Sequence, residues 1–207
     1  MRKIIAIKFI IIFILIFTST AVVLIVGGKG SDVSDKSPPP SYRIKGDPNA
    51  KVIIVEYSDF ACPSCAYMND YLNNLIKYFA NDFVLYFKHL PLTDIHPNSI
   101  KAAIWAECVG IEENKFFDFA DLLFKNRNEW ANANDYVSLF EKYTKEVGAN
   151  LDRVRSCYNS GKGVEFVEAD IKKAEKMNLN STPTFFVNGR IAIGGRALVE
   201  EIKKEKR

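Results

Sequence analysis

Two cysteines separated by two residues, in the run Cys62-Pro63-Ser64-Cys65, constrain the fold of this chain more than any other feature. An apolar run at residues 51–57 precedes them and predicts a buried strand, whereas Pro63 favours the first turn of a helix. This order places Cys62 at a helix N-terminus, where unpaired N–H groups and the helix dipole stabilise a thiolate. Cys65 follows one turn later on the same face, so the two cysteines are able to form a disulfide.

Cysteines with this spacing also serve as half of a zinc site. Zinc would require two further ligands, and the only histidines in the chain are His89 and His96. Because the motif stands where a strand leads into a helix, we favour redox chemistry and expect neither a metal nor another cofactor.

The net positive charge of the chain comes from its amino end. The formal net charge of +3 equals the contribution of Arg2, Lys3 and Lys8, so the rest of the 207-residue sequence has no net charge. A chain without a basic surplus is not expected to bind nucleic acid. Its length fits one domain, or one domain with an insertion.

Residues 9–28 are a run of 20 residues without a charge. A helix of this length spans roughly 30 Å, the thickness of the hydrocarbon layer, and the preceding basic residues keep its amino end in the cytoplasm. Two interpretations are open: a single-pass anchor over residues 1–28, which the apolar sequence from Val22 onward favours, and a signal peptide cut near residues 19–21. The remainder then lies at the extracytoplasmic face of the cell membrane or is secreted.

A linker is expected between this segment and the folded domain. Residues 29–43 follow Gly27-Gly28 and contain four serines and three consecutive prolines at 38–40. This composition predicts a stiff, extended connection that holds a domain over residues 44–205 away from the membrane.

The order of elements after the linker indicates an α/β fold. The helix that follows Cys62 is expected to run to about Ala80, and residues 83–88 predict a second strand, so the first half is a β-α-β unit with a right-handed crossover. From about residue 95 to 177, apolar residues recur at three- and four-residue steps, which predicts an inserted helical domain.

The chain ends with a predicted β-hairpin and helix. Residues 184–187 and 190–193 flank Asn188-Gly189, a dipeptide typical of tight hairpin turns, and a helix is expected over 197–204. The domain therefore combines a β-α-β half and a β-β-α half, with the helical insertion between them.

Two residues outside the cysteine motif are candidates for the same site. Pro183, after Thr182, either ends the preceding segment or adopts a cis bond, packs against the cysteines and exposes a backbone edge to an extended substrate. Glu56 either points to an exposed face of its strand or is buried. If it is buried, its pKa rises, and it could transfer a proton for Cys65.

The remaining cysteines, Cys108 and Cys157, both fall in the helical region. They are either buried free thiols or a structural disulfide, and an oxidising compartment favours the disulfide. Such a bond would close a loop of about 50 residues and add about 3–4 kcal/mol of stability.

Several motifs, in this order, resemble the DsbA family of thiol:disulfide oxidoreductases, and especially its membrane-anchored, BdbD-like members with Pro-Ser between the cysteines. The motifs are Tyr57-Ser-Asp-Phe-Ala-Cys-Pro-Ser-Cys65, Lys88-His-Leu-Pro-Leu92, His96-Pro97, Glu107-Cys108, Phe116-Phe117 and Ser181-Thr-Pro-Thr-Phe-Phe-Val-Asn-Gly189. The resemblance covers about residues 44–205 and implies a thioredoxin fold with an inserted helical domain.

The resemblance also implies roles for the site residues. Cys62 is the nucleophile and Cys65 the resolving cysteine of a redox-active disulfide, Pro183 is the cis proline, and Glu56 is the family's buried acid. Pro63, Ser64 and Thr182 are expected to form the substrate groove. Ser64 stands where the best-studied members carry His, and it offers the Cys62 thiolate only a hydroxyl, so the resemblance leaves the redox potential open.

By the same resemblance, the protein is expected to act as a monomer that introduces disulfides into reduced exported proteins. A DsbB- or VKOR-like membrane oxidase would reoxidise it. Two alternatives stay open: a disulfide reductase or isomerase of the same fold, and a non-catalytic module that binds chains near Pro183. Isomerases of this fold are usually dimers with an added domain, and a pure binding module would not need both thiols.

Overall fold

The computed structural model describes residues 33–79 and 81–205. The N-terminal anchor expected over residues 1–28, and the start of the expected linker, lie outside these described residues. Within the described ranges, no helix combines the length and the apolar character that a membrane span requires.

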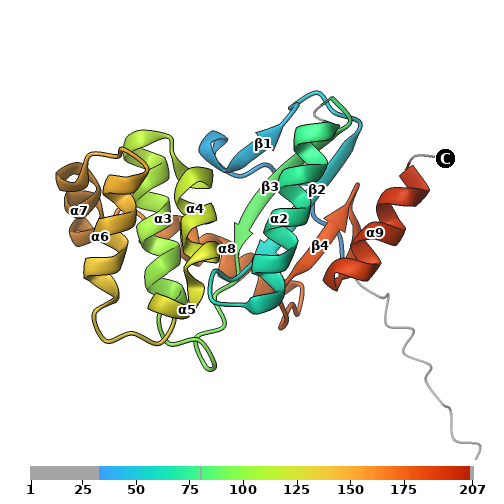
Figure 1. The fold of residues 1–207 in the computed structure, drawn as a ribbon. Helices are drawn as coiled ribbons and strands as arrows, with labels where there is room; N and C mark the ends of the chain where they lie inside the picture. The colour runs from blue at the N-terminus through green and yellow to red at the C-terminus, as the bar shows by residue number, and fades with distance from the viewer. Residues whose placement is uncertain (1–32, 80, 206–207) are drawn as a thin grey trace, which may run out of the picture. The chain divides into compact units, whose positions relative to one another are not determined.

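A five-stranded mixed sheet forms the centre of the domain, with the strand order β1-β3-β2-β4-β5 (Figure 1). Strands β2 (Val52–Ser58) and β3 (Phe83–His89) run parallel and are joined by helix α2 (Pro63–Tyr78). Strands β4 (Thr184–Val187) and β5 (Arg190–Ile193) form an antiparallel hairpin, and β4 pairs with β2. The predicted α/β class is confirmed, and the arrangement is the thioredoxin fold that the resemblance implies.

Alternating side chains of the central strands pack on opposite faces of the sheet. Ile54 and Leu85 lie in one apolar cluster with residues of α2 and of α9 (Gly194–Glu205), whereas Val55 and Tyr86 share a second cluster with Ala174 of α8 (Val164–Lys176). Both faces are therefore covered by helices, which explains why the two central strands are apolar almost throughout. Figure 1 shows α2 in front of the sheet.

The predicted helical insertion is confirmed between β3 and β4. Its helices pack around a cluster of buried aromatic and aliphatic residues, and a disulfide joins Cys108 to Cys157 across 49 positions of sequence. The helices are α3 (Ser99–Glu113), α4 (Phe116–Lys125), α5 (Arg127–Trp130), α6 (Tyr136–Glu146), α7 (Leu151–Ser160) and α8 (Val164–Lys176).

Residues 33–43 pack against the domain instead of extending away from it. Asp35 is buried, accepts a hydrogen bond from the Tyr57 hydroxyl at 2.7 Å and pairs with Lys173 at 2.6 Å. The prediction of a stiff, extended linker is therefore wrong for residues 33–43, because Asp35 contacts Tyr57 of β2 and Lys173 of α8. The compact unit begins at Val33 rather than at residue 44.

The segment continues into a short strand that the sequence did not predict. After a 3-10 turn, η1 (Ser41–Arg43), strand β1 (Ile44–Gly46) pairs antiparallel with β3. Gly46 has a φ of +99°, and a Cβ there would lie 2.3 Å from the Phe83 carbonyl oxygen, so glycine is required at the end of β1, where the chain leaves the strand.

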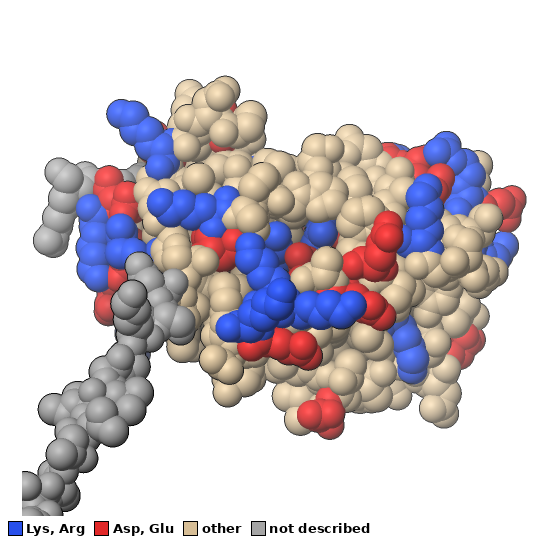
Figure 2. Space-filling model, turned by 180° about the vertical axis from the view of Figure 1, so that it is seen from behind, with Lys and Arg blue, Asp and Glu red and all other residues tan. Residues whose placement is uncertain are grey.

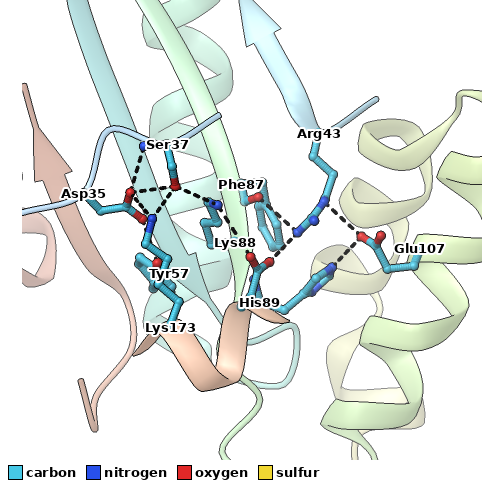
Figure 3. A network of polar contacts seen from close by, with 10 residues as sticks. Asp35, Ser37, Arg43, Tyr57, Phe87, Lys88, His89, Glu107 and Lys173 are labelled. Carbon is cyan, nitrogen blue, oxygen red and sulfur yellow. Dashed lines mark hydrogen bonds and ion pairs between the residues drawn. The ribbon is translucent and has the colours of Figure 1, made fainter. Parts of the chain in front are cut away.

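Arg43 connects this segment to the helical insertion through buried ion pairs (Figure 3). Its Nε lies 3.1 Å from Oε1 of Glu107, and its Nη1 contacts the carboxylate of Asp170. His89 Nε2 lies 2.8 Å from the same oxygen of Glu107, and the His89 N–H donates to Asp170 at 3.0 Å. Because buried charges are stable only when paired, this network fixes the end of β3 against α3 and α8.

Charged side chains of both signs are interspersed on the face seen from behind in Figure 2. Helix α8 contributes Lys172, which pairs with Glu168 at 3.2 Å, and Lys173, which pairs with Asp35. These lysines are thus balanced by neighbouring carboxylates.

Candidate functional site

The turn at residues 59–62 leads from β2 into α2 and places Cys62 directly before the helix. Cys62 has extended backbone angles, φ −77° and ψ 125°, and Pro63 is the first helical residue. Because Pro63 has no N–H, the next two N–H groups of the first turn are those of Ser64 and Cys65, and both lower the pKa of Cys62. The predicted strand-to-helix step therefore directs backbone donors at this sulfur.

Cys62 and Cys65 are both free thiols and differ in their accessibility. Cys62 retains 8% of its surface, whereas Cys65 is fully enclosed. The Sγ of Cys62 lies 3.5 Å from the carbonyl oxygen of Thr182, and the Thr182–Pro183 peptide bond is cis. The loop before β4 is thus brought against the cysteine that an incoming molecule reaches first.

The pKa of Cys62 is lowered to about 5. The largest cause is the hydrogen bond from the Cys65 thiol, and Thr182 and the N–H groups of Cys65 and Ser64 lower this pKa further against the opposing effect of burial. At neutral pH, Cys62 is therefore a thiolate, which is both the attacking and the leaving form in disulfide exchange.

The pKa of Cys65 is shifted in the opposite direction from that of Cys62. Burial raises its pKa well above the ordinary value, and the hydrogen bond to Cys62 and the charge of Glu56 raise it further. Within one pair, the accessible sulfur is ionised and the enclosed sulfur is protonated.

Glu56 is buried at 2% exposure, which excludes the alternative of an exposed strand face. Burial raises its pKa to about 7, the Cys62 charge also raises it, and the Ser58 hydroxyl, which donates at 2.9 Å, lowers it. A carboxyl that titrates near neutrality beside a pair of thiols is suited to hold and release a proton.

The two histidines that zinc would need are engaged elsewhere. His89 pairs with Glu107, and His96 Nδ1 lies 2.8 Å from Oδ2 of Asp59. Among the residues that the structure describes, no group of three or more His, Cys, Asp or Glu side chains is placed to hold a metal ion.

A groove of about 560 Å³ lies beside the cysteines, between the start of α2 and α9. The sequence predicts Pro63, Ser64 and Thr182 as groove residues; the first two line it, whereas Thr182 lies against Cys62 instead. Most of the wall is apolar, and one cation is present. The complete lining is Pro63, Ser64, Tyr67, Met68, Tyr71, Gly195, Arg196 and Val199.

Sequence reasoning missed two residues that hold the turn before Cys62. The carboxylate of Asp59 accepts the Ala61 N–H at 2.8 Å, and Arg127 of α5 donates to the Ala61 carbonyl oxygen at 3.4 Å. An acid two residues before a backbone N–H in a turn is a detectable signal for the first contact. No local pattern indicates the second contact, which spans 66 positions.

Comparison with known proteins gives a family match over most of the chain. A family model described as thioredoxin matches residues 40–204. The structure of oxidised BdbD from Bacillus subtilis is similar, with a TM-score of 0.69 and 27% identity over 83% of this chain and 96% of that one. The thiol-disulfide exchange protein α-DsbA2 from Wolbachia pipientis has a TM-score of 0.68 at 19% identity, over 84% of this chain and 89% of that one, a similarity of fold.

Curated relatives match the same domain within longer proteins. The Na⁺/H⁺ antiporter NhaA 1 of Mycobacterium sp. (strain KMS) is 32% identical over 158 residues, which is 73% of this chain and 24% of the antiporter. NhaA 1 of Salinispora arenicola (strain CNS-205) is 34% identical over 152 residues, 73% of this chain and 22% of that protein. The chain thus spans about a quarter of the length of these relatives.

Proposed function

Because this chain belongs to the thioredoxin family as a DsbA-like member, we propose that it is an extracytoplasmic oxidoreductase that introduces disulfides into reduced exported proteins. The observation that carries the proposal is the division of roles between two sulfurs, since Cys62 is an accessible thiolate and Cys65 an enclosed thiol. A reduced form stabilised in this way makes the corresponding disulfide a stronger oxidant.

The proposed cycle begins with the Cys62–Cys65 disulfide. A substrate thiolate attacks the Sγ of Cys62, which breaks the bond between the cysteines and joins Cys62 to the substrate. Cys65 leaves with the electron pair and takes a proton, which Glu56 supplies from its buried position. The raised pKa of Cys65 makes this protonation favourable.

The second substrate thiolate then attacks the substrate sulfur of the mixed disulfide. Cys62 leaves as a thiolate, because its pKa of about 5 makes it a good leaving group at neutral pH. The substrate has lost two electrons and two protons, and the enzyme has gained the electrons as one thiolate and one thiol. A DsbB- or VKOR-like membrane oxidase is the partner that would restore the enzyme disulfide.

The groove between α2 and α9 supports a polypeptide as the substrate. Its lining is mostly apolar and aromatic, and it begins at Pro63 and Ser64, next to the reactive sulfur. Unfolded chains expose apolar side chains that folded proteins bury, so such a wall favours unfolded, reduced substrates.

The proposed location rests on two features of the chain. The uncharged run at residues 9–28 supports an anchor, or a cleaved signal, that places the domain outside the cytoplasm. The disulfide between Cys108 and Cys157 supports an oxidising compartment, because structural disulfides are rare in reducing ones.

The proposal is tested by mixing the oxidised protein with a reduced, unfolded substrate that carries two cysteines. We expect one substrate disulfide per enzyme and no oxidation by Cys62→Ala. With a substrate that already carries a disulfide, we expect mixed disulfides to accumulate on Cys65→Ala, because Cys62 attacks the substrate disulfide and no second enzyme thiol resolves the product. Oxidation that survives in Cys62→Ala would contradict the proposal. Rearrangement of scrambled disulfides without net oxidation would instead support the isomerase alternative.

A further inference from the structure

Asp59 stands at the start of the turn that carries the reactive cysteine and bonds to the turn at two points. Its carbonyl oxygen accepts the Cys62 N–H at 3.0 Å, and Oδ1 of its carboxylate accepts the Ala61 N–H at 2.8 Å. Its backbone N–H also lowers the pKa of the enclosed thiol of Cys65. One residue therefore contacts the turn and the enclosed thiol.

The other carboxylate oxygen of Asp59 reaches a separate part of the chain. Oδ2 accepts the Leu92 N–H at 2.9 Å and lies 2.8 Å from Nδ1 of His96, both in the loop that follows β3. The Asp59 side chain is completely buried, whereas that of His96 is 19% exposed. The carboxylate thus joins the turn before α2 to the loop after β3.

We propose that Asp59 is a positioning residue, whose carboxylate holds the turn in the geometry that directs backbone N–H groups at the Cys62 thiolate. The inference rests on the proposed function, since it concerns the reactivity of the same sulfur. The turn has two further supports: Phe60 stacks on Phe87 with ring centroids 5.3 Å apart, and Arg127 holds the Ala61 carbonyl. Asp59 differs from these because it bonds both the turn and the opposite loop.

An amide cannot replace this carboxylate. The carboxylate presents two acceptor oxygens to three donors, whereas the side chain of asparagine has one acceptor oxygen and an NH₂ group that would face a donor. Asp59→Asn must therefore release either the Ala61 N–H or the loop after β3. The released turn then directs its donors less well at the Cys62 sulfur.

The test measures the Cys62 thiolate in the full chain by its absorbance near 240 nm as a function of pH. We expect Asp59→Asn to raise the pKa of Cys62 by about one unit, which corresponds to about 1.4 kcal/mol. The sign is diagnostic, because removal of a nearby negative charge would by itself lower the pKa of a thiol. The matched control is Asp47→Asn, since Asp47 accepts the Asn49 N–H at 2.8 Å in a similar turn at the other end of β2.

A pKa of Cys62 that stays unchanged or falls in Asp59→Asn would overturn the proposal, even if the protein loses thermal stability. If this variant does not fold, the comparison moves to His96→Ala and His96→Asn. Both remove the imidazole, but only asparagine keeps an N–H group near the position of Nδ1. We expect a higher Cys62 pKa in the alanine variant, and equal values would contradict the inference. Failure of the proposed function itself would show separately, as a wild-type protein that oxidises no substrate.

Discussion

Replacement of the buried acid Glu56 by glutamine should change how the stability of the domain depends on pH. Glutamine has the size and shape of the protonated carboxyl, and its oxygen can still accept the Ser58 hydroxyl that bonds Glu56 at 2.9 Å. The variant therefore removes the titratable carboxyl group and retains the packing of the side chain.

The magnitude follows from the raised pKa of Glu56. The folded state holds the proton up to a pKa of about 7, whereas the unfolded chain releases it at the ordinary value of 4.5. Between these values the folded state binds more protons than the unfolded state, so this group makes stability fall as pH rises. At 1.36 kcal/mol per unit, the total loss above pH 7 is about 3 kcal/mol.

The assay is urea unfolding of the oxidised protein from pH 4 to pH 8, where neither cysteine of the active pair titrates. We expect wild type and Glu56→Gln to be similar near pH 4, and the variant to be more stable near pH 8 by up to about 3 kcal/mol, because the Cys62 charge that adds to the raised pKa is absent from the disulfide form. The matched control is Glu200→Gln, at an exposed position of α9. A difference between wild type and Glu56→Gln that does not grow with pH would show that Glu56 has no raised pKa in the folded protein.

Three further predictions concern the cysteines and the buried ion pairs. Cys65→Ala should raise the pKa of Cys62 in a thiolate absorbance titration, since the hydrogen bond from Cys65 is the largest cause of the lowered value; an unchanged midpoint would assign that effect to the backbone. Cys108→Ala with Cys157→Ala should lower the free energy of unfolding by about 3–4 kcal/mol without moving the Cys62 titration, and a moved titration would contradict a purely structural role. Arg43→Met should cost about 3–5 kcal/mol in denaturant unfolding because it removes the guanidinium that two buried carboxylates share, and a neutral effect would mean that His89 and Lys88 alone stabilise Glu107 and Asp170.

The elements that the sequence predicted well are those with strong local patterns. The apolar run at 51–57, the turn at Asn188-Gly189 and the helical periodicity of residues 95–177 each carry their own signal, and each element forms within a few residues of its expected bounds. The cysteine motif likewise has its strand before it and its helix after it.

The features that the sequence did not predict depend on contacts between distant residues. Asp35 is buried because it pairs with Lys173, which lies 138 positions away in the sequence. Nothing in the Gly- and Pro-containing segment around Asp35 indicates that partner. Arg43 pairs with Asp170 across 127 positions, and β1 is only three residues long. Local composition indicates the conformation that a segment adopts in isolation. Ion pairs with distant residues can stabilise a different conformation in the folded protein.

Within the site, the local reasoning identified the reactive pair but not its supports. Cys62, Cys65 and Glu56 are candidates from the sequence because each residue type is unusual in its immediate context. Asp59 gives no such signal, because an acid in a turn is common and its bond to the loop at Leu92 exists only in the folded protein.

The redox potential of the Cys62–Cys65 pair, obtained by equilibrating the protein with glutathione buffers, decides whether the protein is an oxidant. A thiolate at Cys62 with a pKa of about 5 stabilises the reduced form, so we expect a potential nearer to about −120 mV than to about −270 mV. A potential near −270 mV, the region of thioredoxin, would contradict the proposed role as an oxidant.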